Sequence, residues 1–97
     1  IGYNAGYSNT TGKKNIAIGN YAGYFNETGN LVICIGDSAG KHNIAGNNLF
    51  IGSQAGKDNV SGTGNAYLGW GAGAYNDGDN NVMIGYWAGI PPIQITK

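Results

Sequence analysis

Charged side chains are scarce in this chain, and their scarcity limits the partners it can have. Its 97 residues include only five Lys and Arg and five Asp and Glu, so the formal net charge at pH 7 is zero. A surface that binds nucleic acid needs concentrated positive charge. We therefore expect no nucleic-acid partner.

Cysteine, histidine and long apolar runs are equally sparse. Cys34 and His42 are the single members of their types, so no internal disulfide and no Cys/His metal spacing can be built. We expect Cys34 to be a small apolar residue and His42 a solvated loop residue. The chain contains no apolar run of 18 residues and no signal peptide, so we expect no membrane contact by this segment. Because it begins inside a repeat, we expect a longer protein to carry any export signal or anchor.

Catalytic patterns are also missing. The five acidic residues are scattered, so they form no carboxylate pair of the kind that hydrolyses glycosides. The Gly-Gly-x-Gly-x-Asp repeat of calcium-binding β-rolls does not occur either. We predict that the protein is not an enzyme and has no cofactor or metal.

Glycine, in contrast, is abundant and periodic. It accounts for 19 of 97 residues, well above the usual share of roughly 7%. The motif Ile-Gly-x-x-Ala-Gly, with Leu once in place of Ile, recurs at steps of 17, 17, 16, 17 and 16 residues, beginning at Ile1, Ile18, Ile35, Ile51, Leu68 and Ile84. A fixed period of this size indicates one structural unit stacked along an axis.

Other positions keep the same period. The third residue after the second motif glycine is always asparagine: Asn9, Asn26, Asn43, Asn59 and Asn76. A further glycine follows at Gly12, Gly29, Gly46 and Gly62, with Asp79 in the fifth copy. Another asparagine precedes most apolar triplets, at Asn15, Asn48, Asn65 and Asn81, whereas Val32 takes this place in the second copy. We predict asparagine ladders along the axis, and we expect 16-residue copies to lose a residue between the turn glycine and the second asparagine.

Each copy is predicted to contain two short strands and two turns. The first strands are the apolar triplets 16–18, 33–35, 49–51, 66–68 and 82–84, and the second strands run through x-x-Ala-Gly. Since side chains alternate along a strand, we expect the large first and third residues inside, facing the motif alanines. Frequent glycine and asparagine disfavour helix. The fold predicted is an all-β parallel β-roll or β-solenoid over residues 1–90, with five full repeats and a partial sixth. Residues 91–97 contain Pro91-Pro92 and are predicted to exit to a neck or linker.

The middle residues of the triplets are then expected to point outward. They are mostly apolar: Ala17, Cys34, Phe50, Tyr67 and Met83. An outward apolar stripe requires covering. We therefore predict that this stripe is the interface of a self-associating fibre.

The segment from Asn15 to Gly29, Asn-Ile-Ala-Ile-Gly-Asn-Tyr-Ala-Gly-Tyr-Phe-Asn-Glu-Thr-Gly, resembles the head repeats of YadA-like trimeric autotransporter adhesins. It resembles the related repeats of phage tail fibres more closely, because its period exceeds that of the commonest adhesin repeat. The likeness covers about residues 1–90. It implies a left-handed β-roll assembled as a homotrimer, located extracellularly on a bacterial surface or in a virion tail fibre, and an attachment function.

Aromatic residues around the motif suggest what such a fibre attaches to. Rings beside amides suit stacking on sugars, and the predicted ligand surface comprises Trp70, Trp87, Tyr86, Tyr21 and Tyr24. The partner would be a cell-surface glycan or host receptor. In the alternative, the rings only stack on one another between coils, at roughly 0.2 to 1 kcal/mol per pair, and the segment is a passive spacer.

Two other solenoid functions are disfavoured by the pattern. The left-handed helices of acyltransferases need an apolar residue every sixth position, but steps from Ile1 reach Tyr7, Lys13 and Gly19. An ice-binding face needs threonines aligned in one slot, and these do not align: Thr10, Thr11, Thr28, Thr63 and Thr96.

Overall fold

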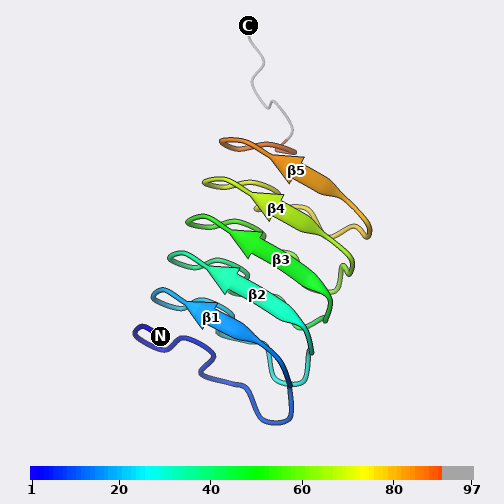
Figure 1. Ribbon diagram of the computed structural model, residues 1–97. Helices are drawn as coiled ribbons and strands as arrows, with labels where there is room; N and C mark the ends of the chain where they lie inside the picture. The colour runs from blue at the N-terminus through cyan, green and yellow to red at the C-terminus, as the bar shows by residue number, and fades with distance from the viewer. Residues whose placement is uncertain (91–97) are drawn as a thin grey trace, which may run out of the picture.

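The computed structural model describes residues 1–90, which form a parallel β-solenoid. Its strands are β1 (Ile16–Ile18), β2 (Val32–Ile35), β3 (Asn48–Ile51), β4 (Ala66–Leu68) and β5 (Val82–Ile84). They form one sheet in the order β1-β2-β3-β4-β5, and the chain makes one circuit between successive strands (Figure 1). The predicted all-β parallel solenoid is confirmed. The predicted exit segment, residues 91–97, lies outside the described residues.

The strands pair in the register that the repeat predicts. Ile18 lies opposite Ile35, Ile35 opposite Ile51, and this column continues through Leu68 to Ile84. Each coil therefore adds one residue of each type to a column that runs along the axis.

The predicted inside and outside of the sheet are reversed. Cys34, Phe50 and Tyr67 are 0 to 1% exposed and form the core. Ala17 and Met83 pack against the same core and are partly buried. The prediction that these five middle residues point outward is wrong, so they cannot form an interface between chains.

The narrowness of the coil explains this reversal. The alanines opposite the strands are fully buried at Ala22, Ala39, Ala55 and Ala72, as predicted. Beside them, Gly56 has a φ of +59°, and a Cβ added there would collide with the ring of Phe50. The interior thus has room for the middle residue of each triplet, and the strand alternation sends the first and third residues outward.

The first and third residues of each triplet form what we term the outer aliphatic face. Its two columns are Ile16, Ile33, Leu49, Ala66 and Val82, and Ile18, Ile35, Ile51, Leu68 and Ile84. None of these ten residues is buried, and exposure reaches 72% at Val82. The sheet therefore presents a continuous apolar surface that this chain does not cover.

The predicted second strand does not form. Its residues instead make overlapping turns, in which the N–H groups of Ala22, Tyr24 and Asn26 donate to carbonyls three residues earlier. Alternate N–H groups still reach the next coil, as from Gly23 to the Ala39 carbonyl at 2.9 Å. This side of the solenoid is thus held by a ladder of hydrogen bonds between turns.

The predicted asparagine ladders are present and buried. The Asn59 side chain donates to Asn43 Oδ1 at 2.9 Å, and the Asn65 backbone donates to Asn48 Oδ1 at 3.0 Å. Asn26, in the same slot as Asn43, is 4% exposed, and its side chain bonds to the backbone of Gly29 in its own turn. Within residues 1–90, no buried side-chain polar atom lacks a partner. The coil interior therefore has an apolar part filled by strand residues and a polar part filled by amides.

The residue missing from short copies is lost at a different place from the one predicted. The Asn59 amide donates to the carbonyl of Gly62 three residues on, whereas the Asn43 amide donates to that of Ala45, two residues on. Likewise, Asn65 donates to Gly78 of the next coil rather than to Asp79. The deletion thus lies before the turn carbonyl, and the spacing from there to the strand is kept.

Candidate functional site

Residues 1–90 contain neither a cluster of metal-ligating side chains nor a membrane-spanning helix. Over residues 1–90, no three His, Cys, Asp or Glu side chains lie close enough together to hold a metal ion. The same part of the chain contains no helix of the length and apolarity needed to span a bilayer. The candidate sites described below are two aromatic clusters and a groove.

The first aromatic cluster surrounds the turn after β1. Tyr24 stacks on Tyr7 with ring centroids 5.2 Å apart and an angle of 7° between planes. Tyr21 meets the edge of Tyr3 at 5.7 Å, and the Lys41 ammonium lies 4.9 Å from the Tyr21 centroid. The predicted ligand residues Tyr21 and Tyr24 therefore lie together.

The second cluster follows β4 and β5. Trp70 stacks on Tyr86 with centroids 5.5 Å apart and contacts Trp87 edge-on at 4.8 Å. Tyr75 stacks on Trp87 at 6.5 Å. Tyr86 nevertheless stays 75% exposed, so the cluster keeps an accessible ring.

The structure thus divides the five predicted ligand residues into two clusters rather than one surface. In both clusters the rings stack across coils, which is the arrangement expected of a structural ladder. The predicted role in ligand binding remains a prediction.

The interior residues have no accessible chemistry. Burial raises the pKa of the Cys34 thiol to about 12, because the thiolate would lose its hydration. Burial also raises the pKa of Tyr67, whose hydroxyl donates to Asn76 Oδ1 at 3.3 Å. Cys34 is therefore a small apolar packing residue, as the sequence predicted.

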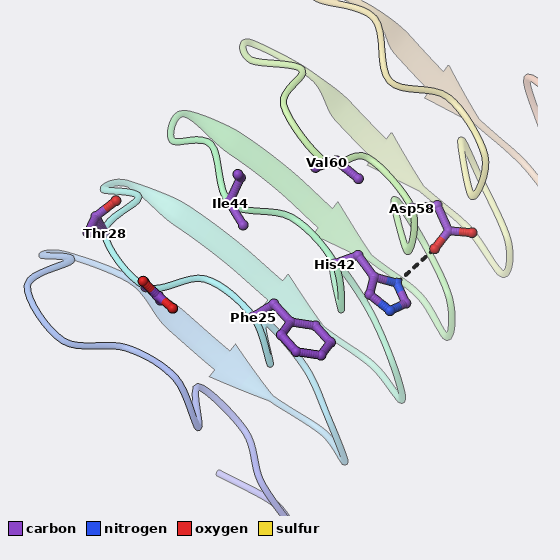
Figure 2. Close-up of a pocket in the computed structure, with 7 residues that line it drawn as sticks. Phe25, Thr28, His42, Ile44, Asp58 and Val60 are labelled. Atoms are coloured by element: carbon purple, nitrogen blue, oxygen red, sulfur yellow. Dashed lines mark hydrogen bonds and ion pairs between the residues drawn. The ribbon is translucent and has the colours of Figure 1, made fainter.

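A groove that the sequence did not predict crosses three successive connections. It has a volume of about 670 Å³ and is lined by Phe25, Glu27, Thr28, His42, Ile44, Asp58 and Val60. These residues belong to the β1–β2, β2–β3 and β3–β4 connections, and none lies on a strand (Figure 2). We call this feature the groove.

Two rings and a carboxylate organise the groove. Phe25 and His42 stack with centroids 5.2 Å apart and planes 14° from parallel. His42 Nδ1 lies 2.8 Å from Asp58 Oδ1 (Figure 2). Since an ionised carboxylate can only accept hydrogen bonds, the N–H of this pair is on His42 Nδ1, which donates a hydrogen bond to Asp58. His42 lies on a connection with its side chain 38% exposed, as predicted, and it is also held by its neighbours in the coils on both sides.

The repeat contains the signal that would have revealed this arrangement. The second residue after the second motif glycine is Ser8, Phe25, His42, Asp58 and Tyr75 in successive copies. Backbone bonds keep this slot aligned, for example from the His42 N–H to the Lys57 carbonyl at 2.9 Å. Residues that share a slot are neighbours in a solenoid, so His42 lies between Phe25 and Asp58.

No protein family model, curated protein or solved structure matches the chain.

Proposed function

We propose that this chain is a module of a homotrimeric attachment fibre, wound as a left-handed β-roll, on a bacterial cell surface or in a virion tail fibre. The observation that carries this proposal is the outer aliphatic face. It presents Ile, Leu and Val on all five strands and includes no charged residue.

A sheet face of this composition is costly to leave in water. Burial of apolar surface contributes roughly 25 cal/mol per Å², and monomeric proteins rarely expose large contiguous apolar patches. A second copy of the chain offers a flat face of the same kind, since every coil repeats the same two columns. Association through this face closes the fibre, and the number three rests on the resemblance to trimeric adhesins and tail fibres.

The attachment part of the proposal rests on the aromatic clusters. Trp70, Tyr86 and Trp87 lie beside turns at one end of the described solenoid, and Tyr21 and Tyr24 lie near the other. Exposed ring surface of this kind stacks on sugar rings of a host glycan. The passive-spacer alternative is favoured by one observation, namely that the rings already pack on one another.

Sedimentation velocity tests the association. We expect the wild type to sediment as a trimer and the double variant Ile18→Lys, Leu68→Lys to sediment as a folded monomer. Leu31→Lys is the matched control, because Leu31 is an exposed aliphatic residue off the strands, with a φ of 60° that Lys14 already adopts at the equivalent position. A well-folded monomeric wild type would refute the fibre.

Glycan-array binding tests the attachment. We expect wild-type binding to fall in the variant Trp70→Ala, Trp87→Ala, with association unchanged. If the wild type binds no glycan, the spacer function replaces the attachment function.

A further inference from the structure

The groove combines a flat ring platform, an aliphatic wall and hydrogen-bonding groups at one place. We propose that the groove is a further ligand site, separate from the second aromatic cluster around Trp70, and that it binds a neutral saccharide. Because it extends the attachment role to a new site, this inference rests on the function proposed above.

The platform is formed by neighbouring coils. Phe25 and His42 stack nearly parallel, 14° apart, and both rings line the groove. Phe25 is 42% exposed, and the side chain of His42 is 38% exposed, so a ligand can reach both. The Asp58 bond to Nδ1 holds the imidazole in place. Such preorganisation lowers the entropy cost of binding.

The aliphatic wall lies two residues farther along the connections. Ile44 and Val60 occupy equivalent positions, and the Ile44 N–H donates to the Val60 carbonyl at 2.9 Å. They are 50% and 41% exposed, whereas the same slot holds the polar residues Thr10, Glu27 and Asp77 in the other copies. An apolar wall beside a ring platform suits a ligand with C–H faces, such as a pyranose.

The charged groups decide which saccharide fits. The lining includes the carboxylates of Glu27 and Asp58 and the hydroxyl of Thr28, but no Lys or Arg. Carboxylates accept hydrogen bonds from sugar hydroxyls and repel sialic or uronic acids. The geometry therefore favours a neutral sugar, and a volume of about 670 Å³ is within the range of small-molecule sites.

The groove adjoins the first aromatic cluster, since Phe25 meets Tyr24 edge-to-face with centroids 4.6 Å apart, but it does not include the outer aliphatic face. The groove residues lie on connections, whereas the outer aliphatic face lies on strands. Association through the sheet would leave the groove accessible in every chain.

The test uses titration calorimetry and a glycan array of neutral and sialylated oligosaccharides. We expect the wild type to bind neutral members, and Phe25→Ser and Asp58→Asn each to weaken this binding at least tenfold. Ser8 already occupies the slot of Phe25 in the preceding copy, so the serine variant keeps the backbone geometry. Asp37→Asn makes the same acid-to-amide change as Asp58→Asn at an exposed residue outside the groove and outside both aromatic clusters, and it should leave groove binding intact.

Three other outcomes would each contradict part of the proposal. Binding that is lost only in the Trp70→Ala, Trp87→Ala variant would overturn the groove and retain the attachment function. Preference for sialylated glycans, or for tetramethylammonium as a cationic probe, would overturn the neutral-saccharide assignment. If neither the wild type nor any variant binds a glycan, both the groove site and the attachment function are refuted. The sedimentation test of association is not affected by this result. Circular dichroism of each variant verifies folding.

Discussion

Phe50 shows, at the level of one residue, how little space the solenoid encloses. Its ring stacks on that of Tyr67 with centroids 5.4 Å apart, and it approaches both Gly40 and Gly56. Neither glycine could carry a side chain without displacing the ring. The interior residue varies in size from Ala17 to Tyr67 along the axis, whereas the alanine and glycine facing it hardly vary. Each interior strand residue contacts mainly the equivalent residues of the adjacent coils. This position can therefore vary in size from coil to coil.

Cys34 provides a chemical test of which side of the sheet is inside. We expect its thiol to be unreactive toward iodoacetamide in the native protein and to react after denaturation in urea. It is 1% exposed and burial raises its pKa to about 12, so almost no accessible thiolate exists at pH 8. Mass spectrometry measures the extent of alkylation. Thr63→Cys in a Cys34→Ala background is the exposed control. If native Cys34 reacts as fast as this control, its side chain faces the solvent and the assignment of the inner face is wrong.

Asp77 makes the stability of the solenoid depend on pH. Its Oδ1 accepts hydrogen bonds from the N–H groups of Ser61 at 2.7 Å and Gly62 at 3.1 Å, and Oδ2 accepts one from the Ser61 hydroxyl. The Ser61 N–H above all lowers the pKa of Asp77 in the folded state. A lowered folded pKa stabilises the fold above the unfolded value, about 3.9, and this contribution is lost as pH falls through the folded pKa.

We therefore expect urea unfolding of the wild type to show a larger loss of stability between pH 6 and pH 2.5 than that of Asp77→Asn. The asparagine variant keeps an acceptor for the Ser61 N–H but has no charge to titrate. Equal losses in both proteins would show that Asp77 does not contribute. Asp37, on a different connection, serves for a parallel Asp37→Asn control.

At the scale of the coil, the first motif glycine controls how closely neighbours stack. Gly36 has a φ of +133°, and a Cβ added there would lie 2.6 Å from the Gly52 carbonyl group of the next coil. Gly85 has nearly the same φ, +130°, but its nearest neighbour would be the Ala88 Cβ at 3.9 Å. The two glycines thus share a backbone conformation and differ in crowding.

Alanine substitution at the two glycines should separate these effects. Gly85→Ala is expected to lower the free energy of unfolding by about 1 to 3 kcal/mol, the usual cost of a strained conformation. Gly36→Ala should cost more, since the backbones of two coils must also move apart. Chemical denaturation monitored by circular dichroism gives both values. Equal costs would show that contact between coils at this slot is unimportant.

The positions and pairing of the strands could be predicted from the sequence, but the face of the sheet that lies inside could not. The 17- and 16-residue steps predicted the strand positions and their pairing, because a column of identical residues forms only in one register. The pattern did not reveal the inner face, since both faces of the triplet are apolar. The decisive signal was Asn48, which precedes Phe50 by two residues and so shares its face. Asparagine recurs there because its amide bonds to the neighbouring coil inside the solenoid.

The candidate sites were predictable to different extents. Tyr21 with Tyr24 could be grouped from the motif, since both lie within two residues of Gly23, and Trp70 with Trp87, since both occupy the x-x part of successive copies. The groove needed a comparison of one slot across copies whose residues differ in chemistry, Phe25, His42 and Asp58. Treating His42 as a single residue in one copy concealed that its neighbours lie one period away on either side.

At the scale of the molecule, the two proposed surfaces have different consequences. The outer aliphatic face lies on the strands and the groove lies on the connections, so one does not obstruct the other. A closed homotrimer would then present three grooves. Several weak sites on one particle bind a surface with greater avidity than any single site.

Stability should also vary along the axis, because each coil contacts only the coil before it and the coil after it. β3 has two strands on either side, whereas β5 is the last strand of the described sheet. The Leu49 N–H donates to the Asn65 carbonyl at 2.8 Å in the centre, and the Gly6 N–H donates to the Ala22 carbonyl at 2.9 Å in the first coil. The two bonds have similar lengths, so any difference in protection must come from their positions.

We therefore expect native-state hydrogen exchange to be slowest around Leu49 and to become faster toward Gly6 and Gly85, since the end coils open without the rest. The monomeric variant Ile18→Lys, Leu68→Lys separates this gradient from the effect of association, which adds protection to all strands together. NMR or mass spectrometry at several urea concentrations measures the opening free energy of each amide. If all amides in the monomeric variant exchange with one common free energy, the coils unfold as a single unit and the nearest-neighbour description does not hold.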